Sequence, residues 1–316
     1  MALIPKGMSF EYGTPERTAE PGDLVLADPQ ASSIYLYEYP STTRQTLLTG
    51  YDDVTGLALL HQEIATDTYA DFLFFTVNTE DTLYIYDLTG TTIPTGFPNP
   101  FPITNSILNA LFGGGDFFES PTAVAASADS GTATVFVLND NGTDSSVRRL
   151  HVNLTTWVPA SPLTIGTMTE SGRRLVDLAH YGETDALFVS KKVVEGLGIA
   201  GWVYRIANAS DRTGSLNLDS ATAFIAQPRS FTGLAVAATN QAGTSGDLLV
   251  LREVLGMAEQ YDIGLGGDPE AFLDFSLLFQ YPQTIGYDCT NRRLVITDVP
   301  FNDDFDRTLF EVFPSQ

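Results

Sequence analysis

The sequence predicts an all-β protein, a six-bladed β-propeller whose last blade is completed by a strand from the N-terminus. Two observations support this prediction. Strand-favouring residues are abundant, with 20 Phe, 13 Tyr and many Val, Ile and Thr. A phrase of two apolar segments separated by a polar turn also recurs along the chain at fairly regular spacings.

The repeated phrase joins a strand rich in small residues to a more apolar strand. Its first strands begin near residues 54, 121, 174, 231 and 284, so the spacings are 67, 53, 57 and 53 residues. Multi-strand units of about 40–50 residues are typical of propeller blades. The small residues fit a strand crowded around a central channel, and the apolar strand fits a position between two blades.

The expected blades cover the chain as one domain, residues 1–316. Their approximate ranges are 8–50, 54–118, 121–165, 174–227, 231–279 and 284–316. The last unit lacks a fourth strand, and residues 2–5, Ala-Leu-Ile-Pro, are expected to supply it. Sharing one sheet between the two chain ends removes the unpaired edges that an open ring would expose.

The stretch GYDCTNRRLVITD (286–298) resembles a phrase of the NHL and YVTN-type six-bladed propellers, in which Tyr-Asp precedes a turn and an Arg-Leu strand ends in Thr-Asp. The resemblance concerns architecture and includes no catalytic motif. Lactonase-like hydrolases with this fold hold a channel calcium ion by Glu, Asn and Asp from the inner ends of separate blades. At the corresponding positions only Glu11 and Asp177 are acidic, with Asp288 slightly further along, so the ligand set is incomplete.

Charge and cysteine content exclude several classes of function. The net charge is −23, and the basic pairs are isolated, so nucleic-acid binding is disfavoured. The sequence has no secretory signal pattern and no apolar run of about 18 residues, so membrane insertion is not expected. The single cysteine, Cys289, excludes an internal disulfide and a thiolate zinc site, and we expect it to be a buried, inert thiol.

Catalytic motifs are missing, so we do not expect an enzyme. His180 is followed by Glu183 and Asp185, which is compatible with a general base and a carboxylate partner. We favour an inner-strand histidine beside a turn, because no nucleophile motif accompanies it. No cofactor is expected, although a calcium ion is possible. Its candidate ligands are Asp303, Asp304 and Asp306. The other polar segment, NDNGTD (139–144), contains the Asn-Gly of a hairpin turn, and we favour the turn.

Residues 93–120 form the longest excursion from the repeat. Proline occurs four times in this segment, a tri-glycine follows at 113–115, and the aromatic residues are Phe97, Phe101, Phe112, Phe117 and Phe118. Long loops in compact domains are usually functional or disordered, and this one is too aromatic for disorder. The five rings either cover a blade or bind a protein partner, since aromatic anchors on a proline-stiffened loop lose little entropy on docking.

These features favour a non-catalytic structural or adhesion module of a larger assembly, for which a tailed-virus (phage) particle is the leading example. The chain would then be found in the extracellular particle, or in the cytoplasm before assembly. Other subunits are the expected partners, and a cell-surface glycan is a further candidate. The first alternative is a calcium-dependent, lactonase-like hydrolase using the channel. The second is a carbohydrate-binding propeller, which its two tryptophans, Trp157 and Trp202, support poorly because they do not recur from blade to blade.

Overall fold

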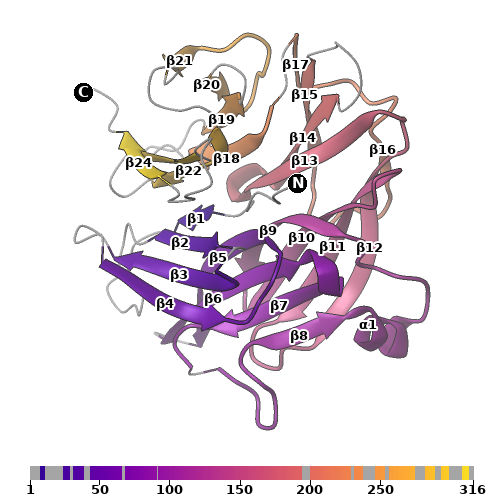
Figure 1. Cartoon of the computed structure of the whole chain (residues 1–316). Helices are drawn as coiled ribbons and strands as arrows, with labels where there is room; N and C mark the ends of the chain where they lie inside the picture. The colour runs from indigo at the N-terminus through magenta and orange to yellow at the C-terminus, as the bar shows by residue number, and fades with distance from the viewer. Residues whose placement is uncertain are drawn as a thin grey trace. The chain divides into compact units, whose positions relative to one another are not determined.

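The computed structural model confirms an all-β fold (Figure 1). It describes residues 8–10, 24–28, 31–38, 43–65, 68–90, 92–193, 200–228, 231–237, 246–252, 256–274, 282–288, 293–298 and 308–312. The chain divides into two compact units. The first contains Met1–Asn141, Ser146–Gly166 and Thr213–Ser215, and the second contains Gly142–Ser145, Thr167–Arg212 and Leu216–Gln316.

Three antiparallel sheets lie wholly or mainly in the first unit. The first sheet contains β1 (Met8–Phe10), β2 (Leu24–Asp28), β3 (Ser33–Glu38) and β4 (Thr43–Thr49). The second contains β5 (Val54–Ala65), β6 (Thr68–Val77), β7 (Thr82–Asp87) and β8 (Phe101–Thr104), and it is followed by helix α1 (Asn105–Phe112). The third contains β9 (Pro121–Asp129), β10 (Thr132–Asp140), β11 (Ser145–Asn153) and β12 (Pro159–Met168), with β16 (Leu216–Asn217) at its edge.

The second unit contains the remaining three sheets. One is formed by β13 (Arg173–Tyr181), β14 (Ala186–Val193), β15 (Gly201–Ala207) and β17 (Ile225–Gln227). The next is formed by β18 (Gly233–Ala237), β19 (Asp247–Arg252), β20 (Met257–Asp262) and β21 (Ala271–Asp274). The last is formed by β22 (Pro282–Asp288), β23 (Arg293–Asp298) and β24 (Thr308–Val312).

Sheets built from consecutive antiparallel strands are the blades of a β-propeller, but the expected number of complete blades is wrong. Five sheets have four or five strands, and the described part of the sixth has three. The difference lies in the last sheet, where the described residues include no outer strand beside β24. Residues 2–5, which were expected to supply that strand, lie outside the described residues.

The first strand of a sheet packs against the first strand of the next sheet within each unit: β5 against β9, and β13 against β18. These first strands carry a recurring irregularity near their start. One residue is skipped in the pairing register of four sheets, and the skipped residues are Thr55, Thr122, Val176 and Gln283. Such a β-bulge bends the strand and increases its local twist.

In two sheets, a glycine near the start of the first strand lies very close to the neighbouring sheet. A Cβ atom on Gly56 would lie 2.6 Å from the backbone nitrogen of Val124, and one on Gly233 would lie 3.3 Å from the nitrogen of Ile285. Glycine at these positions lets two backbones approach within van der Waals distance. The small residues that the sequence shows in the first strands therefore have a packing function.

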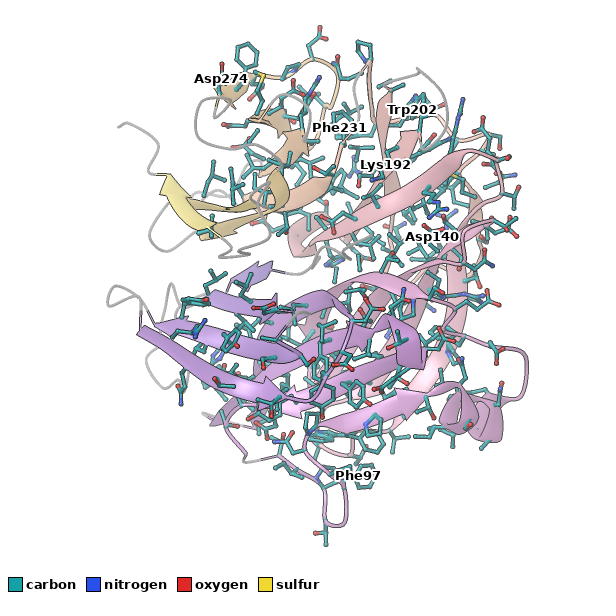
Figure 2. The ribbon with its side chains drawn as sticks, viewed as in Figure 1. Phe97, Asp140, Lys192, Trp202, Phe231 and Asp274 are labelled. Atoms are coloured by element: carbon teal, nitrogen blue, oxygen red, sulfur yellow. The ribbon has the colours of Figure 1, made fainter. Side chains whose placement is uncertain are left out.

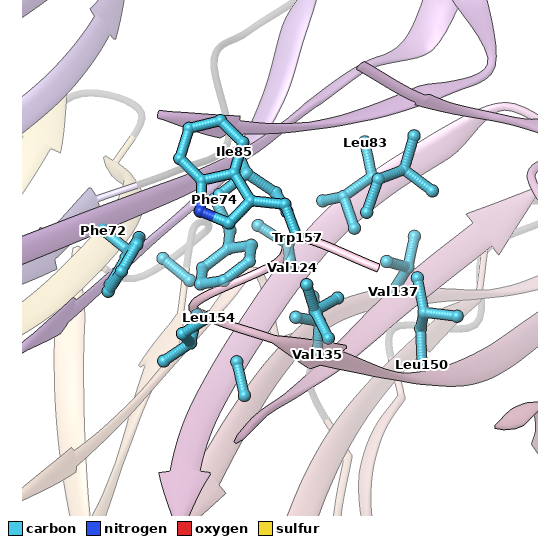
Figure 3. Packing of buried hydrophobic residues seen from close by; sticks show 14 of the residues in the cluster. Phe72, Phe74, Leu83, Ile85, Val124, Val135, Val137, Leu150, Leu154 and Trp157 are labelled. Atoms are coloured by element: carbon cyan, nitrogen blue, oxygen red, sulfur yellow. The ribbon is translucent and has the colours of Figure 1, made fainter. Parts of the chain in front are cut away.

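The largest core cluster of the first unit lies between its second and third sheets (Figure 3). Trp157, in the turn between β11 and β12, is fully buried there beside Phe72 and Phe74. The neighbouring side chains in Figure 3 come from β7, β9 and β10, including Leu83, Val124 and Val135. Aromatic rings packed between two sheets in this way fix how those sheets stack.

The Gly56→Ala variant tests the close approach of the first strands. Its methyl group would overlap the backbone of Val124, so we expect a loss of about 1–3 kcal/mol in the free energy of unfolding. Urea denaturation followed by fluorescence measures this loss. Gly115→Ala is the matched control, since open space surrounds that position, and it should change stability by less than about 0.5 kcal/mol. Equal stability of the two variants would contradict the packing argument.

Candidate functional site

Asp177, a predicted calcium ligand, lies at the position after the bulge in β13. Its Oδ2 accepts a hydrogen bond of 2.8 Å from the backbone N–H of Leu234 in β18, and its Oδ1 accepts one of 2.9 Å from the N–H of Leu178. Leu234 corresponds to Val124 and Ile285, the residues that Gly56 and Gly233 approach in their own units. Asp177 therefore joins two adjacent first strands through a side chain where the other sheets use bare backbone.

The other predicted metal ligands are not brought together with Asp177 in the described residues. Glu11, Asp303, Asp304 and Asp306 lie outside them. Within the described part of the chain, no group of three or more His, Cys, Asp or Glu side chains is placed to hold a metal ion. A calcium site at these residues stays a prediction.

His180 lies near the end of β13, and the structure pairs it with Asp185 rather than with a nucleophile. Its Nε2 is 3.0 Å from Oδ1 of Asp185, and its side chain is only 5% exposed. Asp185 ends a 3-10 turn (Gly182–Thr184) in the left-handed region, with φ 48°, and also accepts a hydrogen bond from the backbone N–H of Ser210. The pair therefore braces a turn, as expected for an inner-strand histidine.

Burial lowers the pKa of His180, and the hydrogen bond and charge of Asp185 oppose this shift only in part. The imidazole is thus neutral in the fold and donates one N–H to the carboxylate. Burial raises the pKa of Asp185, but hydrogen bonds from Ser210 and His180 outweigh it, so the pKa lies below its ordinary value. A neutral, buried histidine held by a carboxylate is available to no solvent-borne substrate in this arrangement.

The excursion at 93–120 is folded, and side-chain hydrogen bonds hold both of its ends. Asn99 makes two bonds with the backbone of Asp87, accepting from its N–H at 3.0 Å and donating to its carbonyl at 2.9 Å. Asn105, at the start of α1, accepts from the N–H groups of Phe117 and Phe118 and donates to the carbonyl of Phe118, each at 2.8 Å. The segment is thus clamped onto the second sheet.

The five aromatic residues of this excursion divide between the core and the surface. Phe117 and Phe118 are buried in the cluster around Trp157. Phe97, on the loop before β8 (Figure 2), and Phe101 are half-buried, with ring centroids 4.6 Å apart, and they pack against the same cluster. Only Phe112 among the five is mainly exposed. Most of the rings therefore cover the blade, and partner binding stays a prediction for Phe112.

The end of α1 forms an exposed apolar site, which we call the α1 tip and define as Leu111 and Phe112. Leu111 is 52% exposed and Phe112 is 45% exposed, although both belong to a regular helix. Figure 1 shows α1 beside β8, where the chain leaves the second sheet. Leu111 was not among the predicted site residues. Its spacing of four residues from Ile107, on a helical segment, is the sequence signal that could have identified it.

Sequence reasoning also missed a buried lysine. Lys191 in β14 is 1% exposed, and its Nζ lies 3.0 Å from Oε2 of Glu170 and 3.3 Å from the hydroxyl of Tyr204. Its charge also lies over the ring of Trp202 (Figure 2), as does that of Arg173. Glu170 pairs with both cations, and the Trp202 ring faces them, so these side chains form an ion network within the fold.

A second buried ion pair lies in β19 and β20. Nη2 of Arg252 is 2.5 Å from Oε2 of Glu259, and the Tyr261 hydroxyl donates to the same oxygen. Burial, followed by the bond to Glu259, raises the pKa of Tyr261 far above its ordinary value. The phenol therefore stays protonated and serves as a hydrogen-bond donor.

Comparisons with known proteins identify the architecture. No protein-family model matches the sequence, and no curated protein matches it. The chain is similar to the solved structure of a calcium-binding protein, regucalcin, from Agrobacterium tumefaciens strain C58. The identity is 14%, the TM-score is 0.57, and the match covers 98% of this chain and 90% of that one.

Two other solved structures agree with this result. The RRP9 WD40 repeats match with 12% identity and a TM-score of 0.53, over 92% of this chain and 71% of that one. U3-55K matches with 12% identity and a TM-score of 0.52, over 92% and 72%. At such low identities the likeness shows the fold alone. It confirms the predicted resemblance to β-propellers at the level of architecture.

The Asp177→Ala variant separates a structural role from calcium binding. We expect a loss of about 1–3 kcal/mol in the free energy of unfolding, because the Leu234 N–H loses its acceptor. Asp177→Asn keeps an acceptor oxygen and should lose less. Both losses should be the same in calcium chloride and in EDTA. The opposite result, calcium stabilising the wild type but not Asp177→Asn, would assign Asp177 to a metal site.

The pH dependence of stability tests whether the His180 imidazole is neutral in the folded protein. The unfolded histidine binds a proton near pH 6.5, whereas the folded one has a lower pKa, so stability is complete above about pH 6.5 and falls below it. The Asp185 carboxylate loses its contribution only at more acidic pH. His180→Gln should therefore show a shallower decline of the urea midpoint between about pH 6.5 and pH 5. Parallel pH curves for variant and wild type would refute the assignment.

Proposed function

We propose that this chain is a non-catalytic β-propeller that binds another protein subunit through the α1 tip, as a structural or adhesion module of a larger assembly. One observation supports this most directly: Leu111 and Phe112 are exposed on a helix that is held firmly to the second sheet. Anchors that are already ordered lose little conformational entropy on binding. An exposed apolar site on such a scaffold is suited to a protein contact.

The titratable groups near the first strands favour this proposal over catalysis. Asp177 bonds to two backbone N–H groups, and His180 bonds to Asp185. Lys191 bonds to Glu170 and Tyr204. Each of these side chains has a role in stabilising the fold, and none is placed beside a nucleophile in the described residues.

A calcium-dependent, lactonase-like hydrolase is the second candidate. The fold likeness to a calcium-binding protein favours it, and Glu11, Asp177 and Asp288 are the residues it would use. A carbohydrate-binding propeller ranks third. Trp157 is fully buried, and the ring of Trp202 is covered by Arg173 and Lys191, so neither offers a sugar an open aromatic face.

The tailed-virus particle stays a prediction, as does residence in the cytoplasm before assembly; the fold comparisons bear on neither. No helix in the described residues has the length and apolar character required to cross a membrane.

Photocrosslinking in the native source tests the proposed function. A benzoylphenylalanine in place of Phe112 should crosslink a discrete partner protein, because the α1 tip would lie in the interface. The same photoreactive residue at Leu265, which is 82% exposed in the second unit, is the matched control and should give no such product. Equal yields at the two positions, or no product at either, would contradict the proposal.

Calcium-dependent turnover addresses the second candidate. The purified chain is assayed against a panel of lactones and esters in calcium chloride and in EDTA, and we expect no difference between the two conditions. Calcium-dependent hydrolysis that is lost in Glu11→Gln or Asp177→Asn would establish the hydrolase and overturn the proposal.

A further inference from the structure

We infer that the α1 tip binds a cationic, apolar protein segment: side chains such as leucine, flanked by lysine or arginine. This inference rests on the proposed function and specifies its partner. The apolar requirement comes from the helix itself, and the cationic requirement comes from the charge of the surrounding chain.

The apolar side chains of α1 form one stripe, which the protein covers only in part. Ile107, Leu108, Leu111 and Phe112 are spaced three and four residues apart, so they share one side of the helix. Leu108 is buried in the core cluster, whereas about half of the surface of Leu111 and Phe112, one turn further, is exposed. The stripe therefore continues past its covered half, and a partner that completes its burial would gain about 25 cal/mol per Å² of apolar surface.

The helix is fixed in place before any partner arrives. The side chain of Thr104 caps its N-terminus by accepting from the N–H of Ile107. Asn105 is clamped to Phe117 and Phe118, and Leu108 is anchored in the core. The Gly113 N–H closes the last turn on the carbonyl of Asn109. Such preorganisation increases affinity without additional contacts.

Open space surrounds the chain directly after the tip. A Cβ atom built on Gly113, Gly114 or Gly115 would meet no other atom within 4 Å. A partner segment can therefore approach the exposed half of the stripe from this side without displacing protein atoms.

The segment that carries the tip is acidic in sequence. Residues 92–120 contain no Lys or Arg, and their two charged residues, Asp116 and Glu119, are both exposed. Arg148 in β11 contacts the segment: its guanidinium lies over the Phe117 ring, bonds to Thr164 and lies close enough to Glu119 to neutralise part of that charge. Opposite charges around an apolar contact accelerate encounter and exclude wrong partners.

The same charge disfavours two other occupants. A second copy would bring a net charge of −23 and the same pair of acidic side chains to its partner's tip, so the two copies would repel each other. Anionic lipid would be repelled in the same way. A basic protein segment is complementary in both charge and apolarity.

Binding of a defined peptide tests the inference. The probe is a fluorescently labelled helical peptide of leucine and lysine, titrated with the full chain near physiological salt. We expect Leu111→Ser/Phe112→Ser to weaken binding roughly tenfold or more, because it removes both apolar anchors. Leu265→Ser, which changes a more exposed apolar residue in the second unit, is the control and should leave the affinity unchanged. Thermal unfolding checks that both variants remain folded.

Two further titrations isolate the contribution of charge. Asp116→Asn/Glu119→Gln should weaken binding and flatten its salt dependence, since it removes the local negative charge. A peptide in which glutamate replaces lysine should not bind. Equal affinity of the glutamate peptide, or equal losses in the tip and Leu265 variants, would overturn the inference.

Three further outcomes distinguish the inferred cationic segment from a lipid surface and from failure of the proposed function. Tip-dependent binding of the chain to zwitterionic phosphatidylcholine vesicles would identify a lipid surface in place of a protein. A crosslink from position 112 without tip-dependent peptide binding would refute the cationic partner but leave the proposed function intact. Failure of the crosslink would reject the proposed function, and the inferred partner with it.

Discussion

The close approach of successive first strands is the constraint on which the rest of the structure depends. Near the strand start one residue faces the next sheet, and at three of these contacts that residue either has no side chain or bonds to the facing backbone. Gly56 and Gly233 satisfy the first condition, and Asp177 satisfies the second. Because two backbones meet at these points, small changes of volume there are transmitted directly to the spacing of the sheets.

This constraint also determines which side chains are available for function. The sequence predicts a calcium ligand at one of these positions, and in the structure Asp177 is occupied in joining two strands. His180 and Lys191 are likewise used within their own sheet. Polar groups that are already paired within the fold cannot be removed from their partners without a cost, so they offer little to a ligand. The exposed apolar end of α1 is a feature that the packing leaves unexplained.

The excursion between β7 and β9 has two roles: it covers the core of the blade, and it carries the exposed α1 tip. The aromatic residues of the sequence do not show which of them serves which role. Phe117 and Phe118 seal the core around Trp157, and Asn105 fixes the backbone that carries them. The rigidity obtained in this way is what makes Leu111 and Phe112 suitable for binding, since a loose arm would lose that order on docking. The rings that cover the blade, Phe117 and Phe118, and the candidate binding residues, Leu111 and Phe112, therefore belong to one folded segment.

The sequence alone determined the all-β class, the repeat and the position of the long excursion, because alternation of apolar and small residues follows from strand geometry. It also identified His180 as a histidine beside a turn. Only the tertiary structure decided the fate of individual side chains. Asp177 reads as a metal ligand in the sequence, and Leu234, 57 residues later, becomes its partner only when two sheets stack. Five phenylalanines look equivalent along the chain, and burial distinguishes them, since it depends on contacts with residues distant in sequence.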